Sequence, residues 1–239
     1  MAQNSLTWPQ NGDDLLEAIE DLTKNPEQAL SSLDQILELL NEPTKNCTNL
    51  ASLSQGQPDM IGKIMAEMTL RKAIEKCLVT IAKMDNGIDE ICKRASKLTD
   101  ISLRSLYAIP TQNLQNWITK KLNEESVDSR KEASSFLKAV ADEYTGRLAS
   151  FKGTLKNVQK KKPERPPLFK ELSPEVISDL CDKVKNEPLW LIRAQLASAL
   201  GSLKSTDELV TCLKEALLDP EESVQRSAKT SLQCLRESS

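Results

Sequence analysis

Cysteines and carboxylates are the side chains of this sequence that could carry chemistry, because the chain contains no histidine. Histidine is the commonest metal ligand and the usual general base, so its absence removes most hydrolytic and metal-dependent mechanisms. No two cysteines form a Cys-x-x-Cys pair. We therefore expect no metal site, and we expect buried, reduced thiols typical of a cytoplasmic or nuclear protein. The six cysteines are Cys47, Cys77, Cys92, Cys181, Cys212 and Cys234.

The paired carboxylates do not indicate an acid–base site. Asp13-Asp14, Glu124-Glu125 and Glu221-Glu222 fall at expected helix starts or turns, where negative charge stabilises the helix dipole. The sequence has no G-x-G-x-x-G, no phosphate-binding loop, no H-E-x-x-H and no G-x-S-x-G motif. A cysteine nucleophile would lack its histidine partner. We expect a protein that is not an enzyme and that has no cofactor and no small-molecule substrate.

Lysine and arginine gather in the middle of the chain, although the whole chain has a net charge of −3. Lys160, Lys161, Lys162 and Arg165 stand in a proline-rich segment that could contact phosphate groups or an acidic protein. A solvated connector is the simpler interpretation. Nucleic-acid binding through the segment 147–165 is the alternative, although few aromatic residues accompany the basic ones.

Two groups of apolar residues are candidate docking elements for a protein partner. Trp8 lies in a polar N-terminal tail, where an isolated aromatic side chain can anchor a partner. Met60, Met65 and Met68 share one helical neighbourhood, and methionine suits adaptable binding grooves. Packing of the methionines in the core, beside Ile64, is the simpler interpretation.

The composition and the spacing of apolar residues predict a chain that is nearly all helix. Glycine and aromatic residues are few, and no apolar run is long enough to cross a membrane. The polar, acidic N-terminus is unlike a secretory signal, so we expect an intracellular protein. Before Pro110 we expect helices over 13–24, from 26 to about 42, 59–83 and 88–98, with a short one from 100. Leu189 to Leu203 is apolar on almost every side, so we expect this helix, Trp190 included, to be covered on several faces.

Apolar and small residues recur in three segments of the chain with one spacing. The last set is Leu209, Leu213, Leu217, Val224, Ala228, Leu232 and Leu235, interrupted by Asp219-Pro220. A shift of 32 residues towards the N-terminus reaches Ile177, Cys181, Lys185, Ile192, Leu196, Leu200 and Leu203. A shift of 95 residues reaches Leu114, Ile118, Leu122, Ser129, Ala133, Leu137 and Val140. A helix–turn–helix unit that recurs in this way is typical of a stacked α-solenoid.

The unit resembles the HEAT repeat, in which an Asp-Pro turn precedes a helix that opens with Val-Arg-x-x-Ala. Asp219-Pro220 gives the turn, and Ile192-Arg193 and Arg130 give the helix start, with the arginine displaced to Arg226 in the last unit. The resemblance implies a ladder of Asp–Arg pairs between adjacent repeats. Asp219 with Arg193 is the matching pair, and we expect the ladder to be incomplete because the other units lack the aspartate.

The resemblance to HEAT-repeat, or armadillo-like, proteins implies an all-α fold, a right-handed α-solenoid of helical hairpins. We divide the chain into a flexible tail (1–11), N-terminal helical repeats (12–159), a basic connector (160–172) and a C-terminal repeat pair (173–239), in one continuous stack. The implied function is that of a non-catalytic scaffold or adaptor that binds protein partners through the surface of the stack. We expect no membrane association.

Overall fold

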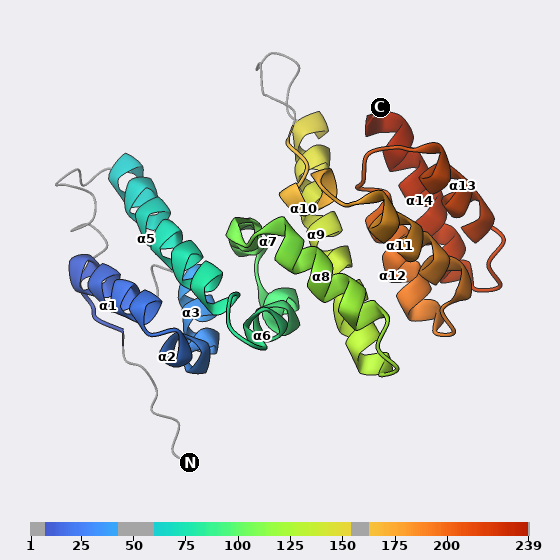
Figure 1. The fold of residues 1–239 in the computed structure, drawn as a ribbon. Coiled ribbons are helices and arrows are strands. Elements are labelled where there is room, and N and C mark those ends of the chain that lie inside the picture. The colour runs from blue at the N-terminus through green and yellow to red at the C-terminus, as the bar shows by residue number, and fades with distance from the viewer. Residues whose placement is uncertain (1–7, 43–59, 154–162, 239) are drawn as a thin grey trace. The chain divides into compact units, whose positions relative to one another are not determined.

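The computed structural model describes residues 8–42, 60–153 and 163–238. These residues form helices and turns and contain no β-strand, which confirms the all-α prediction (Figure 1). They divide into two compact units, Met1–Pro110 (unit 1) and Thr111–Ser239 (unit 2). The division falls at Pro110 and not at the basic connector, so the hairpin expected within the N-terminal repeats belongs to unit 2. No helix in the described ranges combines the length and the apolar character that a bilayer crossing requires.

Unit 1 is built around one long helix. Its elements are α1 (Gly12–Lys24), α2 (Pro26–Ser31), α3 (Leu33–Asn41), α5 (Met60–Ile81), α6 (Gly87–Arg94), η2 (Ala95–Lys97), α7 (Asp100–Leu103) and η3 (Arg104–Ala108). α1 begins where the side chain of Asn11 accepts a hydrogen bond from the Asp13 N–H, at 3.1 Å. The helix expected from 26 to 42 is divided at Ser32 into α2 and α3. α1, α2 and α3 all pack against α5.

The turn between α5 and α6 requires a glycine. Asn86 adopts the left-handed conformation with φ of 63°. Gly87 follows, and a Cβ atom at this position would lie 1.8 Å from the carbonyl oxygen of Ile81. The chain can therefore fold back directly after α5 because residue 87 has no side chain.

The described residues of unit 2 form three helical hairpins and a short connecting helix. Its elements are α8 (Thr111–Leu122), α9 (Val127–Gly153), α10 (Pro167–Lys170), α11 (Pro174–Asn186), α12 (Trp190–Leu200), α13 (Asp207–Ala216) and α14 (Glu222–Ser238). The first helices of the hairpins, α8, α11 and α13, pack in that order, and the second helices, α9, α12 and α14, do the same. α9 runs unbroken through Gly146, although glycine lowers helix propensity.

α12 lies at the centre of this arrangement, between α9 and α14. Ile192, Leu196 and Leu200 are fully buried in it, as an almost wholly apolar helix requires. Its C-terminal end lies very close to α14: a Cβ on Gly201 would be 2.7 Å from the Cα atom of Ser231. The Ser231 hydroxyl donates to the carbonyl of Ala197 at 2.7 Å, so a hydrogen bond fixes the two helices at this close approach.

Candidate protein-binding surfaces

Arg193 joins two successive turns of unit 2. Its Nε and Nη2 donate to the two carboxylate oxygens of Asp219, in the α13–α14 turn, at 2.7 and 2.9 Å. Its Nη1 donates to the carbonyls of Glu187 and Pro188, in the α11–α12 turn, at 2.8 and 3.1 Å. Arg193 holds the pKa of the Asp219 carboxyl below its usual value, mainly through these hydrogen bonds. This is the pair that the sequence predicted.

Arg130 repeats the same geometry one hairpin earlier. Its Nε and Nη2 donate to Glu187 at 3.0 and 3.3 Å, and its Nη1 donates to the carbonyls of Glu124 and Glu125 at 2.9 and 2.7 Å. The ladder therefore extends further than the sequence analysis expected, because Glu187 takes the place of the missing aspartate. Glu187-Pro188 stands 32 residues before Asp219-Pro220. The repeat spacing could have identified it.

The last hairpin has a glutamine where the other two have the arginine. Gln225, which stands 32 residues after Arg193, donates from Nε2 to the carbonyl of Asp219 at 2.6 Å. Arg226 is not the displaced ladder arginine that we expected, because it pairs with Glu222 on the exposed side of α14. Gln225 hydrogen-bonds to the turn of its own hairpin, but it has no positive charge with which to pair with a carboxylate of a further turn.

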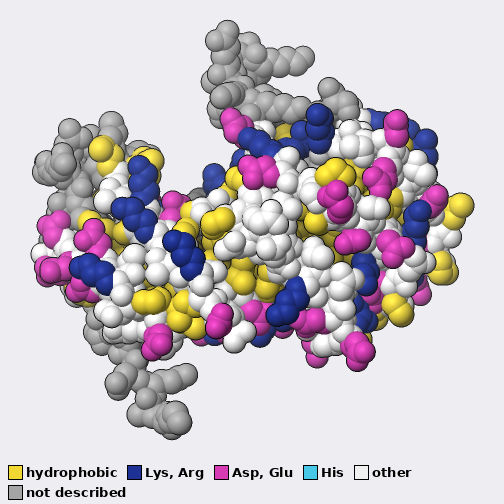
Figure 2. All heavy atoms as spheres, in the orientation of Figure 1, with side chains coloured by type: hydrophobic (Ala, Val, Ile, Leu, Met, Phe, Trp, Pro, Cys, Tyr) yellow, Lys and Arg dark blue, Asp and Glu magenta, His cyan; other side chains and the backbone are white. Residues whose placement is uncertain are grey.

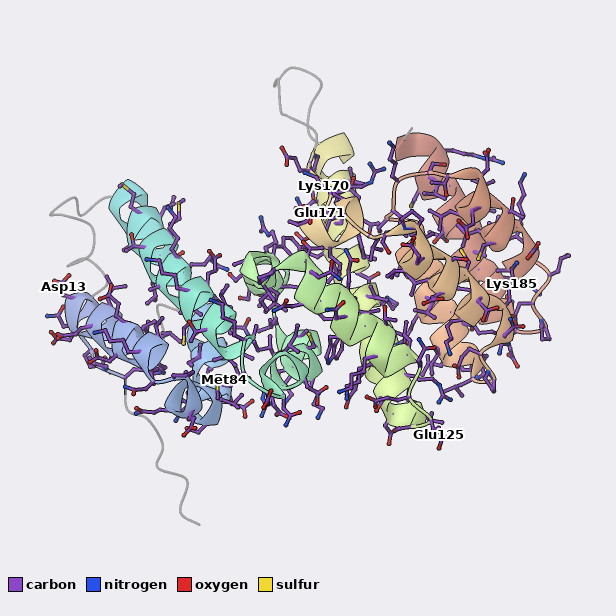
Figure 3. The ribbon with its side chains drawn as sticks, viewed as in Figure 1. Asp13, Met84, Glu125, Lys170, Glu171 and Lys185 are labelled. Carbon is purple, nitrogen blue, oxygen red and sulfur yellow. The ribbon has the colours of Figure 1, made fainter. Side chains whose placement is uncertain are left out.

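The described residues of the basic segment make polar and apolar contacts within unit 2. Arg165 donates from Nε to the carbonyl of Ser202 at 3.2 Å. The neighbouring Leu168 and Phe169 are buried, while Lys170 pairs with Glu164 at 2.9 Å. Figure 3 shows Lys170 at the end of α10. Lys160, Lys161 and Lys162 lie outside the described residues.

Arg147, at the start of the proposed basic segment, is also engaged. It pairs with the buried carboxylate of Glu143 one turn earlier on α9, with Nε 2.6 Å from Oε1. Its guanidinium lies over the ring of Tyr144, 5.5 Å from the centroid. Both contacts engage the guanidinium of Arg147 within α9.

The outer face of α5 exposes the residues that we expected in the core. Ile64, Met65 and Met68 are between 49% and 55% exposed, because α5 turns the opposite face towards its neighbours. That buried face includes Ala66, Leu70, Ile74, Leu78 and Ile81. The side chain of Met60 lies outside the described residues.

Basic residues continue the same face of α5 towards its C-terminal end. Lys72 and Lys76 are exposed and follow Met68 at intervals of one helical turn. Figure 2 shows hydrophobic side chains beside basic ones over this helix. We call the outer face formed by Ile64, Met65, Met68, Lys72 and Lys76 the α5 face.

Trp8 and Trp190 differ from our expectations in how far their side chains are exposed. Trp8, the candidate anchor in the tail, is only 9% exposed, so it is not free to reach a partner in this structure. Trp190, expected to be covered, is 40% exposed. It is the first residue of α12 and therefore lies beyond the central, covered part of that helix.

Four of the five cysteines in the described residues are buried. Cys77, Cys181 and Cys212 are buried, as their positions on apolar helix faces predicted. Burial raises the pKa of the Cys77 thiol to about 11, which makes it a poor nucleophile at neutral pH. The described residues contain no group of histidine, cysteine or carboxylate side chains that could hold a metal ion.

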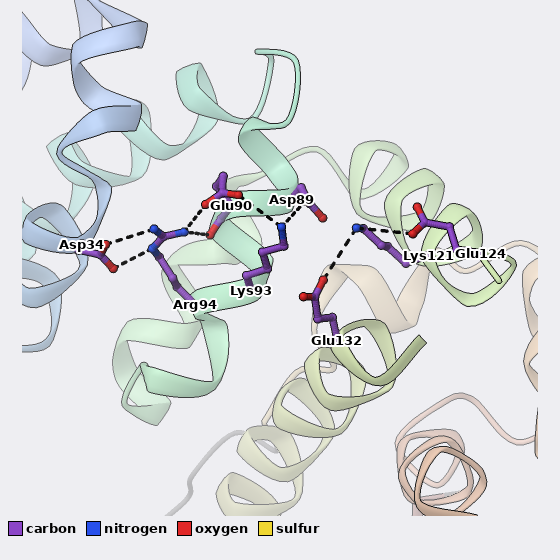
Figure 4. A network of polar contacts seen from close by, with 8 residues as sticks. All are labelled: Asp34, Asp89, Glu90, Lys93, Arg94, Lys121, Glu124 and Glu132. Carbon is purple, nitrogen blue, oxygen red and sulfur yellow. Dashed lines mark hydrogen bonds and ion pairs between the residues drawn. The ribbon is translucent and has the colours of Figure 1, made fainter. Parts of the chain in front are cut away.

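The polar network around Asp34, Glu90 and Arg94 in Figure 4 connects α3 and α6 within unit 1. Arg94 donates to both carboxylate oxygens of Asp34, at 2.7 and 3.1 Å, and to Glu90 at 2.5 Å. These hydrogen bonds lower the pKa of both carboxyl groups. The network is a structural clamp, since each charge in it has a partner of opposite sign within the unit.

Comparison with known proteins does not assign the chain to a family. No protein-family model matches the sequence. No curated protein matches it either.

Proposed function

We propose that this protein is a non-catalytic scaffold or adaptor that binds other proteins, and that unit 2 is a right-handed solenoid of HEAT-like hairpins. Three hairpins whose first helices pack in series, and whose second helices do the same, support the solenoid. The repeated arrangement of Arg130 and Arg193 supports it further, since the two arginines make the same set of contacts in successive hairpins. Buried thiols support a location in the cytoplasm or nucleus.

Exposure of the α5 face is the observation that best supports a protein-binding function. Adjacent exposed aliphatic and thioether side chains on a charged surface are typical of a site that a partner covers. Lys72 and Lys76 extend this face with positive charge. The complementary partner is an amphipathic helix with apolar residues opposite Met65 and Met68 and acidic residues opposite the lysines.

Quantitative affinity purification from native cells tests this proposal. The intact protein should recover a partner at a nearly stoichiometric level, and the double variant Met65→Ser/Met68→Ser should lose it. Lys204→Ser, at an exposed position outside α5, is the matched control and should retain the partner. Recovery of no protein at that level, or equal recovery by the double variant, would contradict the proposal.

Nucleic-acid binding through the segment 147–165 has less support, because Arg147 and Arg165 are bonded within unit 2. Charge reversal at Lys160, Lys161 and Lys162 separates the two functions. The reversal should leave the protein partner bound. A nucleic-acid affinity that falls steeply with salt in the intact protein, and that the reversed variant lacks, would favour the alternative.

A further inference from the structure

The exposed large apolar side chains described in unit 2 all lie at the turns within its hairpins. Val127 and Trp190 are the first residues of α9 and α12, Leu191 follows Trp190, and Leu218 lies in the α13–α14 turn. Their exposed fractions range from 37% to 85%. We call these four residues the turn strip.

The arginine ladder shows that the three turns lie next to one another in a row. Arg130 connects the α8–α9 turn to Glu187, and Arg193 connects the α11–α12 turn to Asp219. Val127, Trp190 and Leu218 stand within a few residues of these contacts. The strip is therefore a line of apolar side chains from successive hairpins, with Trp190 in the middle.

The turns that carry the strip are rich in carboxylates. The segments 123–128, 186–191 and 217–223 contain seven carboxylates and no lysine or arginine. The ladder neutralises two of them, Glu187 and Asp219. Asp128 and Glu222 are highly exposed, at 89% and 76% of their side chains. Lys121, Lys131 and Arg226 pair with Glu124, Asp128 and Glu222, so the uncompensated negative charge of the turns lies at the exposed Glu125 and Glu221.

The spacing of the strip favours an extended ligand. Packed helices lie about 8–10 Å apart, so neighbouring turns of the row are separated by roughly this distance. A polyproline II segment rises about 3.1 Å per residue with three residues per turn, so every third side chain returns to the same face after about 9 Å. One such segment can place an apolar residue beside each turn and direct the residues between them towards the carboxylates.

We propose that the turn strip binds an extended, basic protein segment that carries an aliphatic residue at every third position, with Trp190 as the central anchor. This proposal rests on the proposed function, and it adds a second binding surface with a ligand of its own chemistry. An exposed tryptophan between apolar neighbours is the residue type that contributes most to such contacts. The acidic turns select against acidic segments by repulsion.

Titration of the full chain with synthetic peptides tests this inference. The probe is a labelled peptide that repeats Leu-Lys-Lys. The matched peptides repeat Leu-Glu-Glu, Ser-Lys-Lys or an alternating Leu-Lys sequence. Anisotropy of the label should show saturable binding of the Leu-Lys-Lys peptide, weakened by added salt. The three matched peptides should bind at least about tenfold more weakly.

Tryptophan fluorescence locates the contact on the protein. Trp8 and Trp117 are buried, so a blue shift on binding should come from Trp190. Trp190→Ser and Leu218→Ser should each weaken peptide binding about tenfold. Met68→Ser should leave it unchanged. Trp190, Leu218 and Met68 are all exposed, and an unchanged circular dichroism melt will establish that each variant is folded.

Three results would overturn the inference: no binding of the Leu-Lys-Lys peptide, equal binding by Trp190→Ser, or preference for the acidic peptide. Equal binding of the alternating peptide would also overturn the every-third-residue spacing. The α5 proposal fails independently of these results. It is judged by loss of the native partner in Met65→Ser/Met68→Ser, a double variant that should still bind the peptide.

Discussion

Arginine is the residue that connects successive hairpins in unit 2, and its planar guanidinium explains why. Nη1 of Arg193 donates hydrogen bonds to two backbone carbonyls of the α11–α12 turn. Nε and Nη2 donate to the two carboxylate oxygens of Asp219. Lysine has one charged nitrogen and cannot satisfy both groups in this fixed geometry. A buried carboxylate in the next turn is therefore stabilised by a neighbour far from it in sequence.

Removal of this guanidinium should be strongly destabilising. Arg193→Ala leaves Asp219 charged with only 8% of its side chain exposed, so we expect a loss of about 3–5 kcal/mol in the free energy of unfolding. Urea denaturation measures this loss in the free energy of unfolding. Arg226→Ala is the control, since both members of its pair with Glu222 are exposed and the loss should stay within about 0.5 kcal/mol. Equal losses in the two variants would show that the ladder is not a stabilising feature.

The Arg193–Asp219 pair should make the free energy of unfolding depend on pH. Arg193 lowers the pKa of Asp219 in the folded protein below its ordinary value of 3.8. The carboxylate therefore stabilises the fold at pH values above 3.8, and this contribution is lost as the pH falls through the lower, folded-state pKa. The free energy of unfolding of the intact protein should exceed that of Asp219→Asn most at neutral pH. The difference should shrink below pH 3.8, and a difference that grows there would contradict this assignment.

At the scale of helices, two glycines of unit 2 have opposite roles. Gly201 permits the close approach of α12 and α14, because a Cβ there would lie 2.6 Å from the Cβ and 2.7 Å from the Cα of Ser231. Gly146 lies inside α9 with no atom within 4 Å of a Cβ built on it. The first glycine is required by packing. The second gives α9 no packing advantage and lowers its helix propensity.

Alanine at each position should therefore change stability in opposite directions. Gly201→Ala should lower the free energy of unfolding by about 1–3 kcal/mol, since α12 and α14 must separate. Gly146→Ala should raise it by about 0.5–1 kcal/mol, because alanine favours the helical backbone. Thermal melts followed by circular dichroism compare the two variants with the intact protein. Stabilisation by Gly201→Ala would mean that the two helices pack less closely than described.

At the scale of the whole chain, the division into two units assigns the two proposed surfaces to different parts. The α5 face belongs to unit 1, and the turn strip belongs to unit 2. Each unit has its own buried apolar residues, such as Leu70 and Ile74 in unit 1 and Leu196 and Leu200 in unit 2. Under the proposed function, each unit would present one binding surface of its own.

Unit 2 should fold without unit 1. A fragment of residues 111–239 retains the three hairpins, the ladder and their core, so we expect helical circular dichroism and a cooperative urea transition. The fragment should also bind the Leu-Lys-Lys peptide with the affinity of the full chain. A fragment that lacks helical structure, while the full chain is folded, would show that the division at Pro110 does not separate independent folding units.

The helices and one ladder pair could be predicted from the sequence. Apolar spacing, caps and prolines are local signals, and they located α1, α5 and α12 to within a few residues. The pairing of Asp219 with Arg193 was implied by the resemblance to the HEAT repeat, and the structure contains this pair. Burial of Cys77, Cys181 and Cys212 followed from the same helical faces.

Only the tertiary structure decided which helix faces are covered. Periodicity gives the angle between side chains on one helix but not the number of neighbours around it. For that reason Ile64 and Met68 were assigned to the core and are exposed, while Trp8 was assigned to solvent and is buried. The structure identified Glu187 as the partner of Arg130, a residue 57 positions away in the sequence. The sequence by itself determined where this chain is helical, and the packing of those helices decided which residues remain for a partner.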